Sequence, residues 1–289
     1  MTARWCGEWA AGERELPAEV EVLIPSFERP AELAVTLSGL ASQTRPDFGV
    51  VVSDQSPEPV WQHPAVKAMV RILRAQGRPV RLEWHLPRRG VAEQRDFLLR
   101  LSTAPQVLFL DNDVWLEPGM LERLSSALSE ARCGFVGAAV QGLSYLQDRR
   151  PAELEDFEPW PGAPQPERIR PGFPEFGRWR LHNAANLAHL AAGIGIERGS
   201  WLLYKVAWVG GCVLFDRERL VAAGGFAFWK DLPPEHAGED VVAQVRTMEA
   251  FGGAGMLPSG AVHLESPTTV PNRTAEALEI VPLDPPQNR

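Results

Sequence analysis

Cysteine and long apolar runs are scarce in this chain of 289 residues. The three cysteines, Cys6, Cys133 and Cys212, lie far apart and include no CxxC pair, so the sequence predicts reduced thiols in a cytosolic protein. The most apolar stretch, residues 201–215, is too short for a membrane span and contains Lys205. The N-terminus lacks the apolar run of a signal peptide. We therefore predict a cytoplasmic protein without a transmembrane segment, and contact with the membrane surface stays open.

An excess of positive charge is also missing. The formal net charge is −8, and the chain has only three lysines, which argues against a general nucleic-acid binder. Hydrophobic residues make up 45% of the chain and charged residues 23%, which is ordinary for a globular protein. The length is enough for one sizeable core. We expect one globular domain that does not bind nucleic acid.

Strands and helices alternate in the first half of the chain. Apolar runs predict strands at residues 21–25, 49–53, 81–85 and 107–110. Between them, apolar residues at helical spacing predict helices from Pro30 onward, over 65–74 and over 90–101. This alternation indicates an α/β fold with a mostly parallel central sheet flanked by helices.

Polar side chains follow directly after three of these strands. Ser26 follows the first strand, Asp54 the second, and Asp111-Asn112-Asp113 the fourth. Because an open parallel sheet binds ligands beyond the carboxyl ends of its strands, we expect these side chains to share one site.

A proline-rich stretch interrupts the second half of the chain. Its prolines are Pro151, Pro159, Pro161, Pro164, Pro166, Pro171 and Pro174. Prolines at this density exclude a long helix or a central strand. The stretch is expected to be an ordered loop or lid, because it has aromatic side chains to bury: Trp160, Phe173, Phe176 and Trp179.

Regular structure is predicted on both sides of this irregular stretch. A helix is expected over residues 118–130 and a strand over 135–140. Regular structure returns at 206–215, and a helix is expected over 240–250. The residues after Pro271 are expected to form a loosely held tail.

The carboxylates of Asp111 and Asp113 carry the clearest chemical signal. Two acids so close repel each other unless a cation or hydrogen-bond donors compensate. Oxygen ligands at a strand end suit Mg²⁺ or Mn²⁺ bridging a diphosphate. The structural alternative is an Asx-rich turn that caps the next helix, for which Glu117-Pro118 is a suitable start.

A competing enzymatic interpretation exists for this motif. Aspartyl-phosphate phosphatases also carry D-x-D after an apolar strand, and there the first Asp is the nucleophile. Those enzymes place the motif near the start of the domain and follow it with a lysine and an acidic pair. This sequence does not show that pattern, so the metal–diphosphate interpretation is favoured.

Seven motifs in order resemble those of the family 2 glycosyltransferases of the GT-A fold. They are V-L-I-P-S-F-E-R-P at 22–30, V-V-S-D-Q-S at 51–56, R-G-V-A-E-Q-R-D at 89–96, D-N-D at 111–113, V-G-G-C at 209–212, G-E-D at 238–240 and His263. The resemblance covers residues 20 to 265. It implies a single GT-A-like domain that moves a sugar from a nucleoside-diphosphate sugar to an acceptor hydroxyl with inversion.

The resemblance also implies how the chain is divided. Residues 1–19 would be an N-terminal extension, 20–140 the nucleotide-sugar-binding half, 141–270 the acceptor-binding half with the proline-rich insertion, and 271–289 a C-terminal tail. Residues 143–200 match nothing in the family, so the acceptor stays open between a glycan, a lipid-linked molecule and a small molecule. Aromatic faces suit sugar rings, whereas a basic run suits a phosphate-bearing acceptor: Arg168, Arg170, Arg178 and Arg180.

Site residues follow from the matched motifs. Nucleotide-sugar contacts are implied for Pro25, Ser26, Glu28, Asp54, Arg89, Arg95, Asp111, Asn112, Gly210 and Gly211. Asp113, Asp111 and His263 would bind Mn²⁺ or Mg²⁺. Asp240 would be the catalytic base, and Glu239 would help to position the acceptor or donor. Ser53 replaces the family's base-reading acid, and Asp54 is expected to take over.

Each of these assignments has a structural alternative. Asp54 also suits the start of a turn, and Arg95 a solvated helix face. Gly210-Gly211 would also relieve crowding in a strand, and Glu239-Asp240 would also stabilise the start of a helix. His263 would otherwise be a satisfied polar group. For the whole chain, the alternative is a catalytically silent GT-A-like domain that binds sugar nucleotides or scaffolds a partner.

Overall fold

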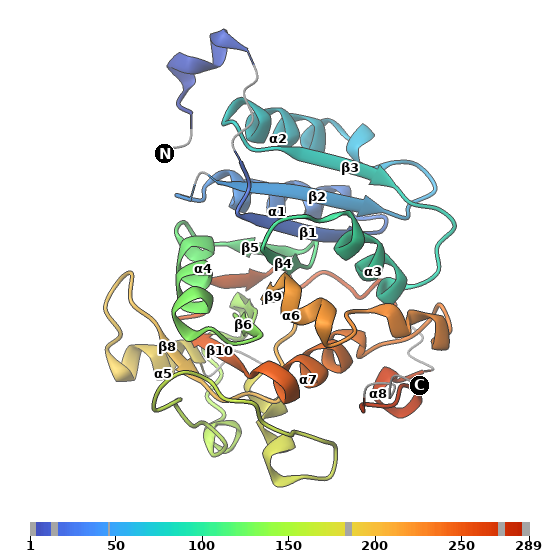
Figure 1. Ribbon diagram of the computed structural model, residues 1–289. Coiled ribbons are helices and arrows are strands. Elements are labelled where there is room, and N and C mark those ends of the chain that lie inside the picture. The colour runs from blue at the N-terminus through green and yellow to red at the C-terminus, as the bar shows by residue number, and fades with distance from the viewer. Residues whose placement is uncertain (1–3, 13–16, 46, 183–186, 271–274, 285–289) are drawn as a thin grey trace.

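The structure is a computed structural model that describes residues 4–12, 17–45, 47–182, 187–270 and 275–284. Its centre is an eight-stranded sheet with the strand order β3-β2-β1-β4-β9-β6-β10-β8 (Figure 1). Its strands are β1 (Val20–Ser26), β2 (Phe48–Asp54), β3 (Val80–Trp84), β4 (Gln106–Leu110), β6 (Phe135–Gly137), β8 (Leu202–Tyr204), β9 (Cys212–Asp216) and β10 (Gly253–Leu257). Only β9 and β8 run antiparallel to their neighbours, so the predicted, mostly parallel sheet is confirmed.

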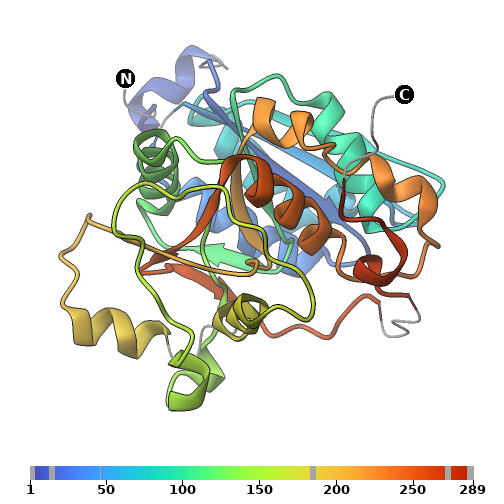
Figure 2. The same cartoon turned by 60° about the horizontal axis from the view of Figure 1, so that its bottom comes forward.

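Helices cover both faces of this sheet (Figures 1 and 2). One face carries α1 (Pro30–Ala41), α2 (Pro64–Ala75) and α4 (Met120–Ala131), and the other carries α3 (Val91–Leu101), α6 (Arg217–Ala222) and α7 (Glu239–Phe251). Side chains of β1 alternate between the two apolar cores: Val22 and Ile24 pack toward α1, whereas Leu23 packs toward α3. Burial on both faces explains why the central strands are continuous apolar runs in the sequence.

A small second sheet has the order β5-β11-β7 and was not predicted. It contains β5 (Val114–Leu116), β7 (Gln141–Gly142) and β11 (Ala261–His263). The antiparallel pairing of β11 with β5 sets His263 opposite Val114. The Leu264 N–H then donates to the Asp113 carbonyl oxygen at 2.9 Å. This pairing brings His263 to Asp113 from 150 residues away.

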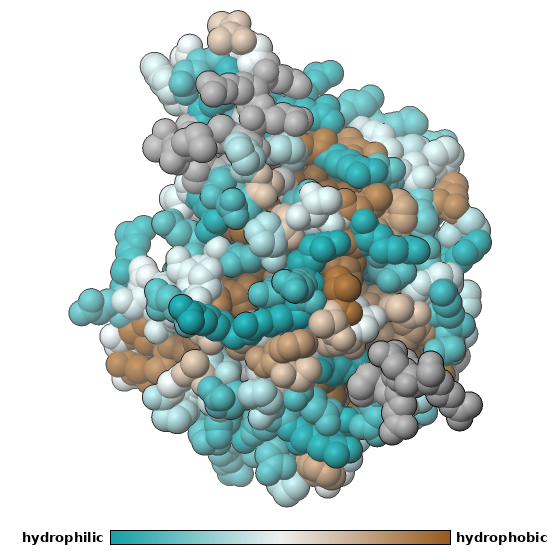
Figure 3. Space-filling model, viewed as in Figure 1, coloured by the Kyte–Doolittle hydropathy of each residue, from teal (hydrophilic) through white to brown (hydrophobic). Residues whose placement is uncertain are grey.

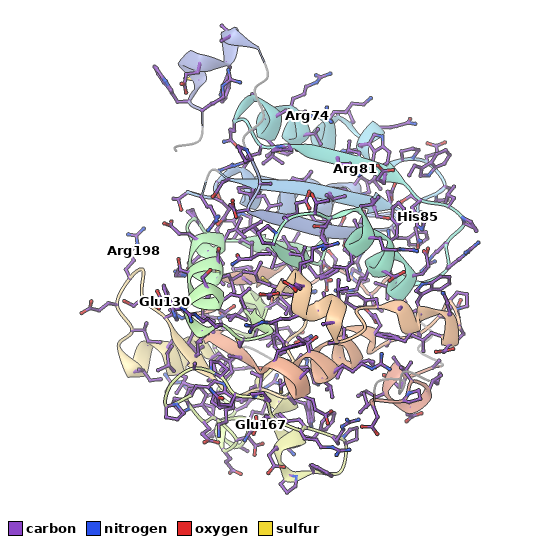
Figure 4. All side chains as sticks on the ribbon, viewed as in Figure 1. Arg74, Arg81, His85, Glu130, Glu167 and Arg198 are labelled. Atoms are coloured by element: carbon purple, nitrogen blue, oxygen red, sulfur yellow. The ribbon has the colours of Figure 1, made fainter. Side chains whose placement is uncertain are left out.

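The proline-rich stretch is packed against the body of the domain. It forms short turns of helix, η4 (Pro151–Leu154) and η5 (Pro174–His182), before α5 (Leu187–Ile194). Ile169 is fully buried, and the Trp160 N–H donates to the Leu203 carbonyl oxygen at 2.9 Å. Glu167, labelled near the bottom of Figure 4, accepts two hydrogen bonds of 2.8 Å from Arg178. The stretch is ordered, as predicted, and contributes to the core.

Two predictions in the second half were wrong. Residues 206–211 are not strand, because Gly211 has a φ of +74° and the Cys212 N–H turns back to the Gly210 carbonyl oxygen at 2.9 Å. The tail after Pro271 was expected to be loosely held. Its residues 271–274 and 285–289 lie outside the described residues, but within 275–284 helix α8 (Ala277–Ile280) packs on α7. Ala277 is fully buried and Val281 almost so, because both belong to the apolar core around α7.

The remaining turns of helix are η1 (Cys6–Ala11), η2 (Val60–Gln62), η3 (Leu143–Tyr145) and η6 (Ala227–Asp231). The face shown in Figure 3 is largely hydrophilic, and one of its apolar groups lies at the lower left, where Figure 1 places α5. Within the described residues, no helix has both the length and the apolar character needed to cross a membrane.

Candidate active site

A cavity of about 740 Å³ opens at the carboxyl ends of β1 and β4. Its lining includes many of the residues predicted from the sequence: Pro25, Ser26, Arg95, Asp111, Asn112, Asp113, Gly210, Gly211, Glu239, Asp240 and His263. These residues come from motifs spread over more than 230 positions, and the fold brings them to one place.

Three predicted contacts do not line this cavity: Glu28, Asp54 and Arg89. The carboxylate of Asp54 is fully buried and accepts hydrogen bonds from the Ser56 hydroxyl at 2.6 Å and the Val60 N–H at 2.8 Å. Burial raises the pKa of Asp54, and the hydrogen bonds oppose this rise. The geometry therefore favours the turn alternative for Asp54.

Arg95 is the buried centre of the acidic group in the cavity. Its guanidinium lies 3.0 Å from Asp111 and 3.0 Å from Glu239. Burial alone would lower the pKa of Arg95, but the carboxylates of Asp111, Glu239 and Asp240 raise it overall. Arg95 on α3 thus joins the acids after β4 to those at the start of α7. The solvated helix face that was the alternative for Arg95 does not apply, because the side chain is buried.

Asp240 occupies the first turn of α7 with its carboxylate toward the cavity. Its Oδ1 accepts the Val241 N–H at 2.9 Å. Burial, and next the neighbouring charge of Glu239, raise the pKa of Asp240 to about 7. A carboxyl with such a pKa exchanges a proton near neutral pH, as a general base must. Burial likewise raises the pKa of Glu239, although Arg95 opposes this effect.

Asp113 has two basic neighbours, one of which was not predicted. Its Oδ2 lies 2.5 Å from the Arg29 guanidinium and 3.5 Å from Nε2 of His263. Burial, and next the charge of Asp111, raise the pKa of Asp113, while His263 and Arg29 lower it. Arg29 also donates to the Pro267 carbonyl oxygen, so it ties the D-N-D loop to the segment after β11.

Within the described residues, no group of three or more His, Cys, Asp or Glu side chains could by itself hold a metal ion. Magnesium is commonly bound by one or two carboxylates together with substrate phosphates, and Asp113 with Asp111 fits that pattern. Nδ1 of His263 accepts the Glu265 N–H at 2.9 Å, so a neutral His263 ring carries its proton on Nε2, facing Asp113. Ligation of a metal through Nε2 would therefore require this proton to move to Nδ1, with loss of the hydrogen bond from the Glu265 N–H.

Gly211 allows a close approach of backbone to the acidic motif. The Asp111 N–H donates to the Gly211 carbonyl oxygen at 2.9 Å. A Cβ atom at residue 211 would lie 3.0 Å from the Val140 side chain and 3.4 Å from the Asp111 carboxylate. Together with the positive φ, this contact explains why the position requires glycine.

Polar contacts fix the ends of β1 and β4 relative to α3. The Asn112 amide donates to the Ser26 hydroxyl at 3.2 Å. The buried Gln94 amide donates to the carbonyl oxygens of Ser26 at 3.2 Å and Ser53 at 2.7 Å. Ser53, which stands in place of an acid, therefore supports Gln94 and does not line the cavity.

Several cavity residues were missed by sequence reasoning. Arg88 lines the cavity in place of Arg89, with its guanidinium 3.8 Å from the centre of the Phe27 ring. His236 donates from Nδ1 to the Pro233 carbonyl oxygen at 2.6 Å and accepts the Ala92 N–H at 3.2 Å. Arginine and aromatic residues adjoining a recognised motif were the only available signal for Arg88 and Phe27.

The arginines of the proline-rich stretch do not line the cavity. Arg168 and Arg170 both pair with Glu249 and Asp284 on the far side of the domain. The other two pair with carboxylates of their own stretch: Arg178 with Glu167 and Glu158, and Arg180 with Asp156. These four arginines lie outside the cavity and are already paired, so the structure gives no support to the prediction that they bind a phosphate on the acceptor.

Two comparisons with known sequences both match glycosyltransferases. The family model described as Glycosyl transferase family 2 matches residues 21–192. An uncharacterized glycosyltransferase of Haemophilus influenzae is 25% identical over 146 residues, which are 47% of this chain and 46% of that protein.

Solved structures share the fold at low sequence identity. Mannosyltransferase PcManGT from Pyrobaculum calidifontis, in complex with GDP-Man and Mn²⁺, matches with a TM-score of 0.54 and 16% identity over 91% of this chain and 64% of that one. S. aureus TarS 1-349, in complex with UDP-GlcNAc, matches with a TM-score of 0.55 and 13% identity over 87% and 60%. The chain spans less than two thirds of the length of each of these proteins. This similarity establishes a shared α/β fold.

Proposed function

Because this chain belongs to glycosyl transferase family 2, we propose that it transfers a sugar from a nucleoside diphosphate to an acceptor hydroxyl with inversion, assisted by Mn²⁺ or Mg²⁺. One observation carries the proposal: Asp240, whose pKa is raised to about 7, shares a cavity with Asp111 and Asp113. A carboxyl that can accept a proton and a pair of acids that can hold a cation are the two parts that such a transfer needs.

The donor diphosphate belongs beside Asp111 and Asp113. Five carboxylates line the cavity against three guanidinium groups, among the residues that the structure describes. A diphosphate would be repelled there without a further cation. Asp113 and Asp111 would hold a divalent ion, with His263 as a further ligand once its ring proton has moved from Nε2 to Nδ1. The bound ion would neutralise negative charge on the leaving diphosphate. The complex of PcManGT with GDP-Man and Mn²⁺, which has the same fold, supports this assignment.

The nucleoside would lie over the ends of β1 and β2. Ser26 lines this side of the cavity, together with Phe27 and Arg88. The Phe27 ring and the Arg88 guanidinium are both planar groups suited to stacking on a base. Pro25 and Gln55 complete the lining on this side.

The reaction would then proceed at Asp240. The acceptor hydroxyl donates a hydrogen bond to this carboxylate and loses its proton to it as the new bond to the anomeric carbon forms. The diphosphate leaves from the opposite face with the electron pair of the broken bond, which inverts the anomeric configuration. Arg95 holds Asp111 and Glu239 in place, and the Val241 N–H holds the Asp240 carboxylate. Buried free cysteines, Cys133 and Cys212, fit a reducing, cytoplasmic location.

Calorimetry on the full chain tests the donor and metal assignment. UDP and GDP should bind at least about tenfold more tightly with Mn²⁺ than with chelator, because the ion offsets charge between carboxylates and diphosphate. Asp113→Asn should remove this difference. Arg29→Gln should strengthen Mn²⁺ binding to the free protein, since Arg29 pairs with the Asp113 carboxylate that would hold the ion.

The matched control is Asp156→Asn, which removes an acid outside the cavity. Equal nucleotide affinity with Mn²⁺ and with chelator would contradict the metal assignment. Nucleotide binding without any donor hydrolysis or transfer, over a panel of sugar nucleotides, would instead identify a catalytically silent binding domain.

A further inference from the structure

Three neighbouring aromatic rings line the side of the cavity that is built by the second half of the chain. Trp179 and His182 belong to η5, and Trp208 precedes β9. The rings of His182 and Trp208 are stacked, with centroids 4.2 Å apart and planes 29° apart. The rings of Trp179 and His182 lie 6.1 Å apart at 37°. All three line the cavity, and we refer to them as the aromatic wall.

The aromatic wall is fixed relative to the base. The Gln244 side chain accepts the Val209 N–H at 2.8 Å and donates to the Val209 carbonyl oxygen at 2.8 Å. The same amide donates to the Asp240 carbonyl oxygen at 3.2 Å. Gln244 is fully buried, so it attaches the residue after Trp208 rigidly to the helix that carries Asp240. A ligand lying on the wall is thereby set at a constant height relative to the Asp240 carboxylate.

The charge around the wall is negative. Among the described residues that line the cavity, those after residue 140 include Glu239, Asp240 and Glu276 but no arginine or lysine. The arginines nearest in sequence to the wall, Arg178 and Arg180, are paired with carboxylates outside the cavity. Arg95 lies among these acids, but its guanidinium is already paired with Glu239 and Asp111. A phosphate group on the acceptor would therefore meet acids whose cation is already shared, which is unfavourable.

Resting on the proposed function, we infer that the acceptor is an uncharged pyranose sugar whose ring lies on the aromatic wall. The π face of an aromatic ring is electron-rich and attracts the slightly positive C–H groups on the flat face of a pyranose. The hydroxyls at the rim of the sugar stay free for hydrogen bonds, and one of them reaches Asp240. Neutral hydroxyls suit this acidic side of the cavity, whereas sugar phosphates and phosphate-linked lipids do not.

Saturation-transfer NMR on the full chain, with UDP or GDP and Mn²⁺ present, tests this inference. The probes are methyl glucoside, galactoside, mannoside and N-acetylglucosaminide, each beside the 6-phosphate of the same sugar. At least one neutral glycoside should bind, and its 6-phosphate should bind at least about tenfold more weakly. Trp208→Ala should weaken glycoside binding roughly tenfold, and Trp208→Phe should retain most of it.

Trp5→Ala is the control, because Trp5 lies in the N-terminal extension and is 67% exposed. Nucleotide affinity, measured by calorimetry, should be the same in all three variants. Preference for a 6-phosphate, failure of every neutral glycoside to bind, or unchanged glycoside binding in Trp208→Ala would overturn the inference. A failure of the proposed donor function would give a different result, because neither UDP nor GDP would then bind, whether or not a glycoside binds.

Discussion

The two halves of the chain meet at one cavity, but they are held together in different ways. Before residue 141, β1 to β4 and their helices are stabilised by apolar packing between elements close in sequence. After residue 140, the irregular segments combine apolar contacts, such as those of Ile169 and Leu181, with ion pairs. Arg170 pairs with Glu249 and Asp284, and Lys205 pairs with Glu158 at 2.6 Å.

The two halves of the chain are suited to two different parts of the proposed reaction, donor binding and acceptor binding. The regular half supplies an edge of strand ends, where backbone and short polar side chains can hold a nucleotide. The irregular half supplies a surface of aromatic rings, which a sugar acceptor can use. Arg95 joins the two halves, since it pairs with Asp111 from one and Glu239 from the other. Changes on the two sides of Arg95 should therefore affect different steps of the reaction.

The largest expected effect is on turnover alone. Asp240→Asn retains the size of the side chain but cannot accept a proton from the acceptor. General-base catalysis contributes roughly 10²–10⁴-fold, so kcat should fall by about that factor. Donor affinity should change little, because the diphosphate site belongs to Asp111 and Asp113 in the first half. Steady-state kinetics and calorimetry on one preparation measure both quantities.

The control for this variant is Asp231→Asn in η6, which changes an acid outside the cavity and should leave kcat unchanged. Near-wild-type turnover in Asp240→Asn would remove Asp240 from the reaction and leave Glu239 as the next candidate. A large loss of donor affinity in Asp240→Asn would instead show that the two halves do not divide the work as described.

A smaller effect is expected on the acidic side of the pH profile of kcat/KM. With the pKa of Asp240 raised to about 7, kcat/KM should rise about tenfold per pH unit below that value and level off above it. Glu239→Gln removes a like charge, which lowers the pKa of Asp240 and moves the limb to lower pH. A profile that is flat from pH 5 to 8 in the wild-type protein would contradict this assignment.

The free energy of unfolding should fall as pH rises, whereas kcat/KM rises. A carboxyl with a raised folded-state pKa binds its proton more tightly in the folded protein, so the free energy of unfolding falls as pH rises from about 3.8 to about 7. Asp240→Asn cannot ionise and avoids this loss. Its stability relative to the wild-type protein should therefore be greater at pH 8 than at pH 4, as measured by urea denaturation.

The sequence was sufficient for the regular half because its signals are local. Helical spacing and apolar runs placed its strands and helices within one residue for most elements. The acids after β4 were found because they follow a strand end directly. Asp54 follows a strand end as well, but the Ser56 hydroxyl and Val60 N–H take up its carboxylate. A position at a strand end thus predicts that a residue lies near the site. Whether its side chain faces the cavity or stabilises a turn depends on its hydrogen bonds.

The irregular half could not be predicted to the same extent, since its contacts link residues far apart. Even in the regular half such a contact was missed, because Arg29 reaches Asp113 across 84 positions and no periodic pattern indicates that pair. In the irregular half, the ring of Trp208 stacks on that of His182, 26 positions earlier in the chain. The arginines of the proline-rich stretch looked like a ligand site, because their carboxylate partners lie as far away as Asp284.

The smallest expected effect concerns those ion pairs and tests whether they hold the second half in place. Arg168 and Arg170 pair with the same two acids, Glu249 and Asp284, but their side chains are 60% and 11% exposed. Arg170→Met would leave Glu249, itself only 28% exposed, without its close partner. The free energy of unfolding should fall by about 1–3 kcal/mol, as when a mostly buried charged hydrogen bond is lost.

Arg168→Met is the matched control, with the same chemical change at an exposed guanidinium 3.4 Å from Glu249. Water already screens that pair, so the loss should stay below about 1 kcal/mol. The midpoint and slope of urea denaturation give both values. Nucleotide affinity should be unchanged in both variants, because neither side chain lines the cavity. Equal, negligible losses would mean that apolar contacts such as those of Ile169 hold the second half, as they do the first, and that the two halves differ only in their regularity.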